Sequence, residues 1–220
     1  MIEVLYEDNH LIAVNKKSGD IVQGDKTGDA PLSDFVKAYI KKKYNKPGEV
    51  FLGTIHRLDR PTSGVVLYSR TSKALSRMNE QFREKQVQKT YWAVVENCPP
   101  TKEGTLENYL QKNQKQNKSY VTKSKGGKHA ILDYKLLRKL DNFFHLEIKP
   151  KTGRHHQIRV QLATIGCIIK GDLKYGAKRS NKDASIHLLA QKLEFVHPVT
   201  KEDITIVAPA PKESVWDACK

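Results

Sequence analysis

Residues 56–64, His-Arg-Leu-Asp-Arg-Pro-Thr-Ser-Gly, place a dense cluster of charge directly before an apolar run, Val65 to Leu67. The apolar run predicts a buried strand over residues 64–68. Burying charge is costly unless the charge is paired, so a charged turn against a buried strand requires a partner or a function. An exposed ion-pair cluster on a turn is the alternative interpretation, and it would contribute only about 0–1 kcal/mol to stability.

Asp59 stands in this segment between two guanidinium groups, those of Arg57 and Arg60. A nearby positive charge favours the ionised carboxylate and lowers its pKa. Arginine cannot relieve the contact by losing its proton. We therefore expect Asp59 to stay ionised, which suits a nucleophile or a charge stabiliser and does not suit a general acid.

The chain is strongly basic, with 39 Lys and Arg residues against 24 Asp and Glu residues and a net charge of +15. Such a charge indicates a polyanionic partner, with nucleic acid favoured over an anionic membrane surface. No apolar run approaches the roughly 20 residues of a spanning helix. The N-terminal residues are acidic where a signal peptide needs a basic region. We therefore expect a cytosolic protein that does not enter a membrane, and a monomer by default.

The hydrophobic pattern predicts helices and strands in an irregular order. Because strands do not alternate regularly with helices, a doubly wound parallel sheet is disfavoured. We expect an α+β fold with a mixed, mostly antiparallel sheet and flanking helices, in a single domain over residues 1–220. The expected elements are a hairpin over 2–15, helices over 31–43, from a cap at Ser72, and over 154–164, and strands over 64–68, 89–95, 132–137, 143–148, 188–195 and 204–207.

Residues 111–128 contain six lysines and no acidic residue, with Asn, Gln and Ser among them. Two interpretations stand for this stretch. It is either a solvated loop, or a flexible cationic arm that neutralises phosphates and makes binding sensitive to salt.

Lys89 and Tyr91 begin a predicted strand, and in a regular strand they share one face. A tyrosine beside a cation offers a plane on which a base can stack, worth about 1–3 kcal/mol, and a phenol that can move a proton. The alternative is that Tyr91 belongs to the core and that Lys89 is a solvated neighbour.

Residues 152–159 read Thr-Gly-Arg-His-His-Gln-Ile-Arg and crowd polar side chains onto the start of a core-packing helix. His156 and Arg159 are three residues apart, so they would be neighbours on one helix face. The crowding predicts an anion or substrate site near a helix N-terminus. The turn-rich segment that follows, from Gly166 through Gly171-Asp172 to Tyr175-Gly176, is a candidate to line the same cleft.

A metal site is disfavoured, because His155 and His156 would point apart on a helix and no clustered cysteines accompany them. The three cysteines are odd in number and lack paired spacing, which fits a reducing compartment and argues against a disulfide framework.

Taken in order, these motifs resemble the RluA-type pseudouridine synthases, which convert uridine in RNA to its carbon-linked isomer. The resemblance covers nearly the whole chain. It runs from the hairpin Leu-Ile-Ala-Val-Asn-Lys, through residues 56–64 and 89–91, to residues 152–159 and the Gly171-Asp172 and Tyr175-Gly176 pairs. One departure is Lys17, where the family usually has proline, so this turn is less rigid.

By this resemblance Asp59 is the catalytic aspartate, and Arg159 is the arginine that pairs with it. Tyr91 would stack on the target uracil and could deprotonate its carbon 5, and Arg57 would enter the RNA stack and support the flipped nucleotide. The other substrate-binding candidates belong to the same motifs and are His56, Arg60, Thr62, Lys89, Arg154, His156 and Gln157.

The resemblance further implies a pseudouridine synthase fold with a central catalytic cleft and a ribosomal or transfer RNA substrate. We expect no separate N-terminal RNA-binding domain, because the catalytic-type hairpin begins at residue 2. No cofactor or metal is implied, because the isomerisation is redox-neutral and the leaving group stays bound.

Several alternatives stay open at this point. The aspartate could attack the anomeric carbon, as the carboxylate of a retaining glycosidase does, remove a proton from the neighbouring sugar carbon, or add to the uracil ring. A non-catalytic RNA-binding protein would explain the charge but not Asp59. A metal-free ribonuclease would use His56 or His156 as acid and base.

Overall fold

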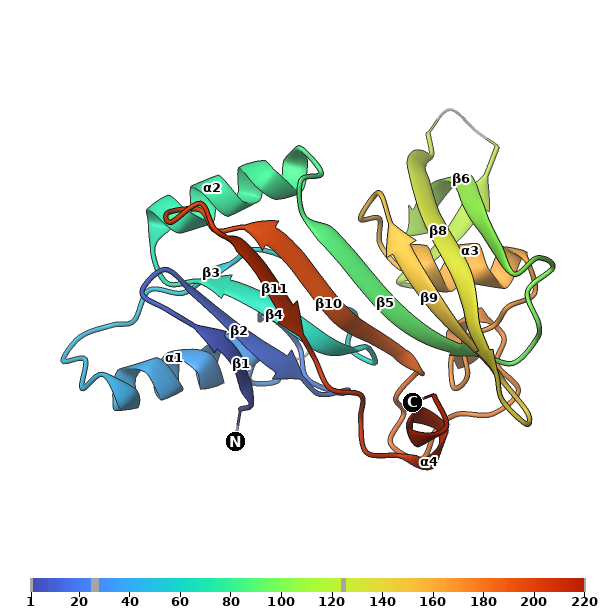
Figure 1. Cartoon of the computed structure of the whole chain (residues 1–220), viewed down its shortest axis with the longest axis horizontal. Coiled ribbons are helices and arrows are strands. Elements are labelled where there is room, and N and C mark those ends of the chain that lie inside the picture. Colours follow the sequence, from blue (N-terminus) through green and yellow to red (C-terminus); the bar gives the residue numbers. More distant parts are fainter. Residues whose placement is uncertain (1, 25–27, 124–125, 220) are drawn as a thin grey trace. The chain divides into compact units, whose positions relative to one another are not determined.

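The computed structural model describes residues 2–24, 28–123 and 126–219, and the chain forms two compact units. Unit 1 contains the residues up to Gln88 together with Ala190–Pro209, and unit 2 contains Lys89–Leu189 together with the residues from Ala210 onward. The elements of both units are labelled in Figure 1. The prediction that residues 1–220 form one catalytic domain stays a prediction.

Unit 1 is a sheet with two helices. Its strands follow the order β1-β2-β4-β10, with β3 pairing on β4 and β11 pairing on β10. The ladders β1–β2, β2–β4, β3–β4 and β10–β11 are all antiparallel. The elements are β1 (Val4–Glu7), β2 (Leu11–Lys16), α1 (Leu32–Lys43), β3 (Gly53–Thr54), β4 (Ser63–Ser69), α2 (Ser72–Arg83), most of β10 (Leu188–Val196) and β11 (Asp203–Val207).

The core of unit 1 lies between helix α1 and strands β2 and β4. Val36 and Ile40 of α1 pack in one buried cluster with Ile12 and Val66 of the strands. Fully burying an aliphatic side chain of this size stabilises the fold by about 1.5–3 kcal/mol. The last turn of α1 is basic, and its positive charges interact favourably with the negative C-terminal end of the helix dipole. The helix predicted over residues 31–43 is confirmed.

Helix α2 begins one residue differently from the prediction. We expected Ser72 to cap it, but the cap is Thr71, whose hydroxyl oxygen accepts a hydrogen bond from the Ala74 N–H at 3.2 Å. Thr71 has an extended backbone and lies three residues before that N–H, which is the geometry of a helix N-cap. Ser72 is therefore the first helical residue.

Unit 2 is an antiparallel sheet of order β5-β9-β8-β6-β7, with helix α3 packed on one face. Ile158 and Leu162 of α3 are buried against Leu132, Leu146 and Ile148 of the sheet. The elements are β5 (Gln88–Val95), β6 (Glu103–Asn113), β7 (Lys118–Thr122), β8 (Lys128–Lys139), β9 (Phe144–Pro150), α3 (Gln157–Thr164), the 3-10 turn η1 (Leu173–Tyr175) and α4 (Ser214–Asp217).

Two predictions for unit 2 were wrong. The helix expected over residues 154–164 starts only at Gln157, because His156 has a left-handed backbone with φ of 55° that cannot continue a right-handed helix. The stretch from residue 111 is not one solvated loop, because Gln111–Asn113 of β6 and Lys118–Thr122 of β7 pair as an antiparallel hairpin around the turn at 114–117. Ser124 and Lys125 lie outside the described residues. The α+β class with a mostly antiparallel sheet is confirmed, whereas the central cleft stays a prediction.

Candidate active site

Asp59 of unit 1 lies in a tight turn, in which its backbone oxygen accepts a hydrogen bond from the Thr62 N–H at 3.0 Å. Leu58 packs against the core beneath α1. On either side of this anchor, Arg57 is exposed and Asp59 is half-buried. The turn therefore presents the carboxylate at the surface of the unit while its neighbour holds the backbone in place.

Lys16, at the end of β2, is the cation beneath this turn. Its side chain is fully buried, and its Nζ donates hydrogen bonds to the backbone oxygens of Lys17, Arg60 and Thr62 at 3.0, 2.9 and 2.7 Å. An ammonium group has three donors, so these three carbonyls match its capacity. Thr62 is itself 2% exposed. Its expected contact with substrate stays a prediction, and its carbonyl helps to fix the turn.

The charge on Lys16 is coupled to the candidate catalytic residue. Burial lowers the pKa of Lys16 to about 8, while the negative charges of Asp20 and Asp59 oppose that shift and Arg60 adds to it. The carboxylate of Asp59 is therefore close enough to stabilise the buried ammonium. We did not predict this role for Lys16. The signal that could have found it is a lysine that ends the apolar strand Leu-Ile-Ala-Val-Asn-Lys.

Arg60 has a carboxylate partner that the sequence did not predict. Its Nη1 lies 2.8 Å from Oδ2 of Asp29, and both side chains are about half exposed. An exposed pair of this kind contributes little to stability. Contact of Asp59 with Arg57 or Arg60 stays a prediction.

His56 and Gly64 fix the two ends of the Asp59 segment to the sheet. Nε2 of His56 accepts a hydrogen bond from the Leu67 N–H at 3.1 Å, and the ring stacks on Phe82 at 5.3 Å. Gly64 has φ of 114°, and a Cβ there would lie 2.2 Å from the backbone oxygen of Ala190. Only glycine fits this close approach of two strands, which explains the last residue of the motif.

In unit 2, Lys89 and Tyr91 lie on strand β5, as predicted. Tyr91 is half-buried and packs against the cluster that contains Ile158 and Leu162 of α3. Burial lowers the pKa of Lys89, whose Nζ would lie 3.9 Å from a Cβ at Gly153. This geometry brings the Lys-Thr-Tyr motif to the face of the sheet that carries α3.

Arg159 of α3 is held by a carboxylate that the sequence analysis mentioned only as part of a turn. Its Nε and Nη2 donate to Oδ2 and Oδ1 of Asp172 at 2.7 and 2.8 Å, and the side chains are 5% and 1% exposed. The guanidinium carbon also lies 5.1 Å from the ring centre of Tyr175. This bidentate contact fixes the plane of the guanidinium. The pairing of Arg159 with Asp59, a residue of the other unit, stays a prediction.

Gln157 organises the approach to α3. Its Oε1 accepts hydrogen bonds from the Thr152 hydroxyl at 2.7 Å and the Arg154 N–H at 3.0 Å, and its Nε2 donates to the Ile131 oxygen at 2.9 Å. Arg154 is exposed, and its Nε donates to the backbone oxygen of His129 at 2.8 Å. The polar crowding noted in the sequence therefore includes a network that shapes the backbone. RNA contacts by Arg154 and Gln157 stay predictions.

His156 lies in an environment that favours its neutral form. It is 8% exposed. Burial and the positive charges of Arg159, His155, Lys174 and Lys112 lower its pKa to about 2. An imidazole with such a pKa is a poor proton donor near neutral pH. Its contact with substrate stays a prediction.

In the part of the chain that the structure describes, no three His, Cys, Asp or Glu side chains gather as a metal ion would require, and no helix is long and apolar enough to span a membrane.

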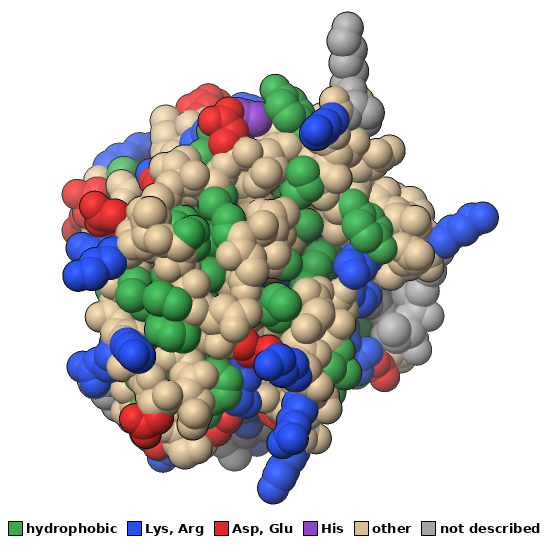
Figure 2. Space-filling view, turned by 90° about the vertical axis from the view of Figure 1, so that its right-hand side faces the viewer, with side chains coloured by type: hydrophobic (Ala, Val, Ile, Leu, Met, Phe, Trp, Pro, Cys, Tyr) green, Lys and Arg blue, Asp and Glu red, His purple; other side chains and the backbone are tan. Residues whose placement is uncertain are grey.

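On the face in Figure 2, Lys and Arg side chains project at several separate places with acidic side chains between them. The positive charge is therefore not gathered into one continuous patch on that face.

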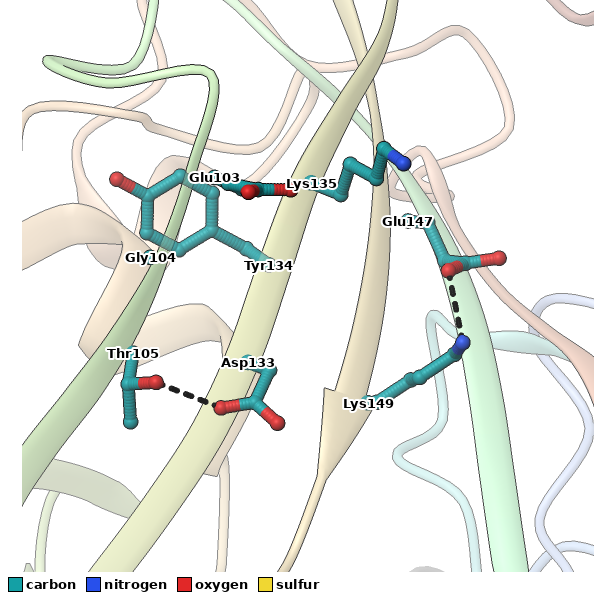
Figure 3. A pocket seen from close by; sticks show the side chains of 8 residues that line it. All are labelled: Glu103, Gly104, Thr105, Asp133, Tyr134, Lys135, Glu147 and Lys149. Atoms are coloured by element: carbon teal, nitrogen blue, oxygen red, sulfur yellow. Dashed lines mark hydrogen bonds and ion pairs between the residues drawn. The ribbon is translucent and has the colours of Figure 1, made fainter.

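A hollow on the open face of β6, β8 and β9 is lined by charged side chains of both signs (Figure 3). Lys149 pairs with Glu147 at 3.1 Å, and Asp133 accepts a hydrogen bond from Thr105 at 2.8 Å. None of the residues that line it is a candidate site residue. Because its charges compensate each other, the hollow is a solvated sheet face and not the candidate site.

Comparison with known proteins agrees with the motifs and the fold. The model of a family described as RNA pseudouridylate synthase matches residues 10–164. The chain therefore belongs to this family, and within it to the RluA type, as the sequence predicted.

Two relatives and one solved structure illustrate the extent of the similarity. The chain is 35% identical to "tRNA pseudouridine synthase C" of Haemophilus influenzae, covering 94% of this chain and 92% of the relative. It is 36% identical to "Ribosomal large subunit pseudouridine synthase C" of Buchnera aphidicola subsp. Schizaphis graminum, covering 94% of this chain and 66% of that protein. The solved structure of "Human RNA Pseudouridylate Synthase Domain Containing 4" has a TM-score of 0.80 at 25% identity, covering 96% of this chain and 89% of that chain.

Proposed function

We propose that this chain isomerises specific uridines in structured RNA to pseudouridine, with Asp59 as the catalytic aspartate. The observation that carries the proposal is the Asp59 turn, which buried Lys16 holds by hydrogen bonds to two of its backbone oxygens, those of Arg60 and Thr62, in a protein of this family. A turn fixed in this way keeps a carboxylate in one position before substrate arrives, which is what a group acting on one sugar or base requires.

The reaction breaks the bond between N1 of uracil and C1′ of ribose and forms a bond between C5 and C1′. A proton leaves C5 and one is taken up at N1, so no oxidant or reductant is needed. Asp59 would act by anomeric attack, by sugar deprotonation or by addition to the ring. Tyr91 would stack on the uracil and receive the C5 proton, and Arg159 would offer a fixed planar fork to the carboxylate.

RNA handling follows from charge and exposure. A base must leave the stack before it can react, at a cost of a few kcal/mol. The exposed Arg57 side chain would enter the stack and support the flipped nucleotide. The positive charge of the protein, +15 in total, would attract the phosphates of the RNA backbone. The names of the relatives support ribosomal or transfer RNA as the substrate class. The proposal includes a monomer that acts in the cytoplasm.

Two alternatives make different predictions. A ribonuclease that uses His156 would need an imidazole with a pKa near the working pH, whereas burial lowers the pKa of His156 to about 2. His56 already accepts a backbone hydrogen bond through Nε2. A non-catalytic RNA-binding protein is compatible with the charge, but it gives no reason for a carboxylate positioned on a rigid turn.

The first prediction concerns Asp59→Ala. Purified wild-type chain and variant are incubated with ribosomal and transfer RNA, and pseudouridine, RNA binding and strand integrity are measured. We expect the variant to lose about 10³-fold or more of the isomerisation rate and to bind RNA about as well as the wild type. The matched control is Asp29→Ala, which removes an exposed carboxylate from the same unit and is expected to stay active.

Full activity of Asp59→Ala would contradict the catalytic role. Binding by the wild-type chain without any pseudouridine would favour the binding protein, and strand scission that the variant retains would favour the nuclease.

A further inference from the structure

The outer edge of strand β7 is closed by a side chain. Ser119 pairs with Lys112 of β6, yet its backbone N–H and C=O both contact the phenol of Tyr175. The Ser119 N–H donates to the phenol oxygen at 2.9 Å, and the phenol donates to the Ser119 oxygen at 3.1 Å. In an antiparallel ladder, residues of alternate pairs turn both backbone groups away from the partner strand. One hydroxyl thus satisfies both outward groups of an edge residue.

The same phenol contacts His156, whose Nδ1 lies 3.0 Å from the phenol oxygen. A hydroxyl has one proton and two lone pairs. If its proton goes to the Ser119 oxygen, it accepts from the Ser119 N–H and from a protonated Nδ1 of neutral His156. Neutrality fits the lowered pKa of this histidine. The left-handed backbone of His156 is a conformation that persists only when its surroundings hold it.

Tyr175 connects this junction to Arg159. Its ring lies 5.1 Å from the guanidinium carbon of Arg159. Asp172 precedes the short 3-10 turn that ends at Tyr175 and binds Arg159 in a bidentate contact. Lys174, in the same turn, donates to the backbone oxygen of Asn117 at 3.1 Å. Residues 172–175 therefore contact the β6–β7 hairpin on one side and Arg159 on the other.

We propose that Tyr175 is a positioning residue. Its hydroxyl connects the β6–β7 hairpin to His156 at the start of α3, and this anchor holds the ring against the guanidinium of Arg159 that Asp172 orients. RNA bound along the lysine-rich hairpin would then be presented to an arginine whose plane is already set. The inference rests on the proposed function, since it gives Arg159 a role in the reaction.

Tyr175→Phe tests the proposal, because it removes the hydroxyl and keeps the ring beside Arg159. The control is Tyr134→Phe, which removes a phenol of strand β8 in the same unit, outside the β6–β7 hairpin, whose oxygen lies 2.8 Å from the Thr101 hydroxyl. Amide hydrogen exchange at Ser119 is measured together with kcat and KM at saturating RNA, well below the unfolding temperature of each variant.

We expect Tyr175→Phe to speed exchange at Ser119 by about tenfold and to lower kcat by about tenfold, with KM changed less than about threefold. Tyr134→Phe should stay within about twofold of the wild type in kcat and in exchange at Ser119. Unchanged exchange at Ser119, or faster exchange with an unchanged kcat, would overturn the proposal, and so would a loss confined to KM.

Two further measurements keep the test decisive. If Tyr175→Phe does not fold, Ser119→Pro removes the N–H donor at an edge where proline is tolerated. It also removes the Ser119 hydroxyl, which lies 2.8 Å from Nδ1 of His155, so Ser119→Ala, which removes the hydroxyl alone, is measured beside it. Ser119→Pro should lower kcat as Tyr175→Phe does, and by more than Ser119→Ala. A wild-type chain that forms no pseudouridine would overturn the proposed function together with this inference. An active wild type beside an unaffected Tyr175→Phe would overturn this inference alone.

Discussion

The contacts of Lys16 show how much of a site depends on residues that are distant from one another in the sequence. Its three acceptors are backbone oxygens, two of them more than 40 residues away along the chain. The motif itself was enough to select Asp59 as the candidate catalytic residue and Gly64 as the start of the strand that follows. The contacts of Lys16, Asp29 and Asp172 were not predicted, because each depends on how distant segments pack.

Lys16→Met should lower the free energy of unfolding by about 2–4 kcal/mol at neutral pH, because three carbonyls lose their donor. The pKa of Lys16 falls from 10.5 to about 8 on folding, so the unfolded chain binds more protons between these values. The wild type should therefore gain stability relative to the variant as the pH rises from about 8 to 10.5, by about 3 kcal/mol.

Denaturant unfolding across this pH range measures the effect, and the adjacent exposed residue gives the control Lys17→Met. A difference between wild type and Lys16→Met that does not change with pH would show that Lys16 does not titrate in this way.

Tyr91→Phe separates the two roles assigned to Tyr91. The ring keeps its packing against α3, so RNA binding should stay within about threefold of the wild type, while the lost phenol should slow turnover by about 10²-fold. Single-turnover kinetics with saturating enzyme measures the step directly. Wild-type turnover in the variant would remove the proton-transfer role and leave only stacking.

At the scale of elements, patterns with a clear period were predicted well. The buried strand β4 and the amphipathic helix α1 fall close to their expected bounds. Strand β6 was missed because most of its residues alternate between exposed and half-buried, next to the edge strand β7, so the apolar signal is weak. The start of α3 was misplaced because the left-handed backbone of His156 has no signature in composition.

The β6–β7 hairpin carries its own prediction. Replacing Lys112 and Lys115 together by glutamine should weaken RNA binding and reduce the slope of log K against log salt by about 1.5, because each phosphate contact releases counterions. Binding measured between low and moderate salt gives the slope. The matched control replaces Lys135 and Lys149, which line a hollow whose charges compensate each other. Equal slopes for both variants would exclude the hairpin as a phosphate-binding element.

At the scale of the whole molecule, charge and motif order predicted the family before any fold was known. The charge indicates a polyanion, and the order of the three motifs indicates the RluA type, which the family match confirms. The α+β class followed from the irregular order of helices and strands. The division into two compact units did not, because length and composition allow one core or two.

Pseudouridine mapping in total RNA tests the central claim most directly. Cells that lack this chain are compared with the same cells expressing either the wild type or Asp59→Ala. We expect one or a few uridines in ribosomal or transfer RNA to be modified only when the wild-type chain is present. Identical maps in all three would contradict the account, as would restoration of the missing sites by Asp59→Ala.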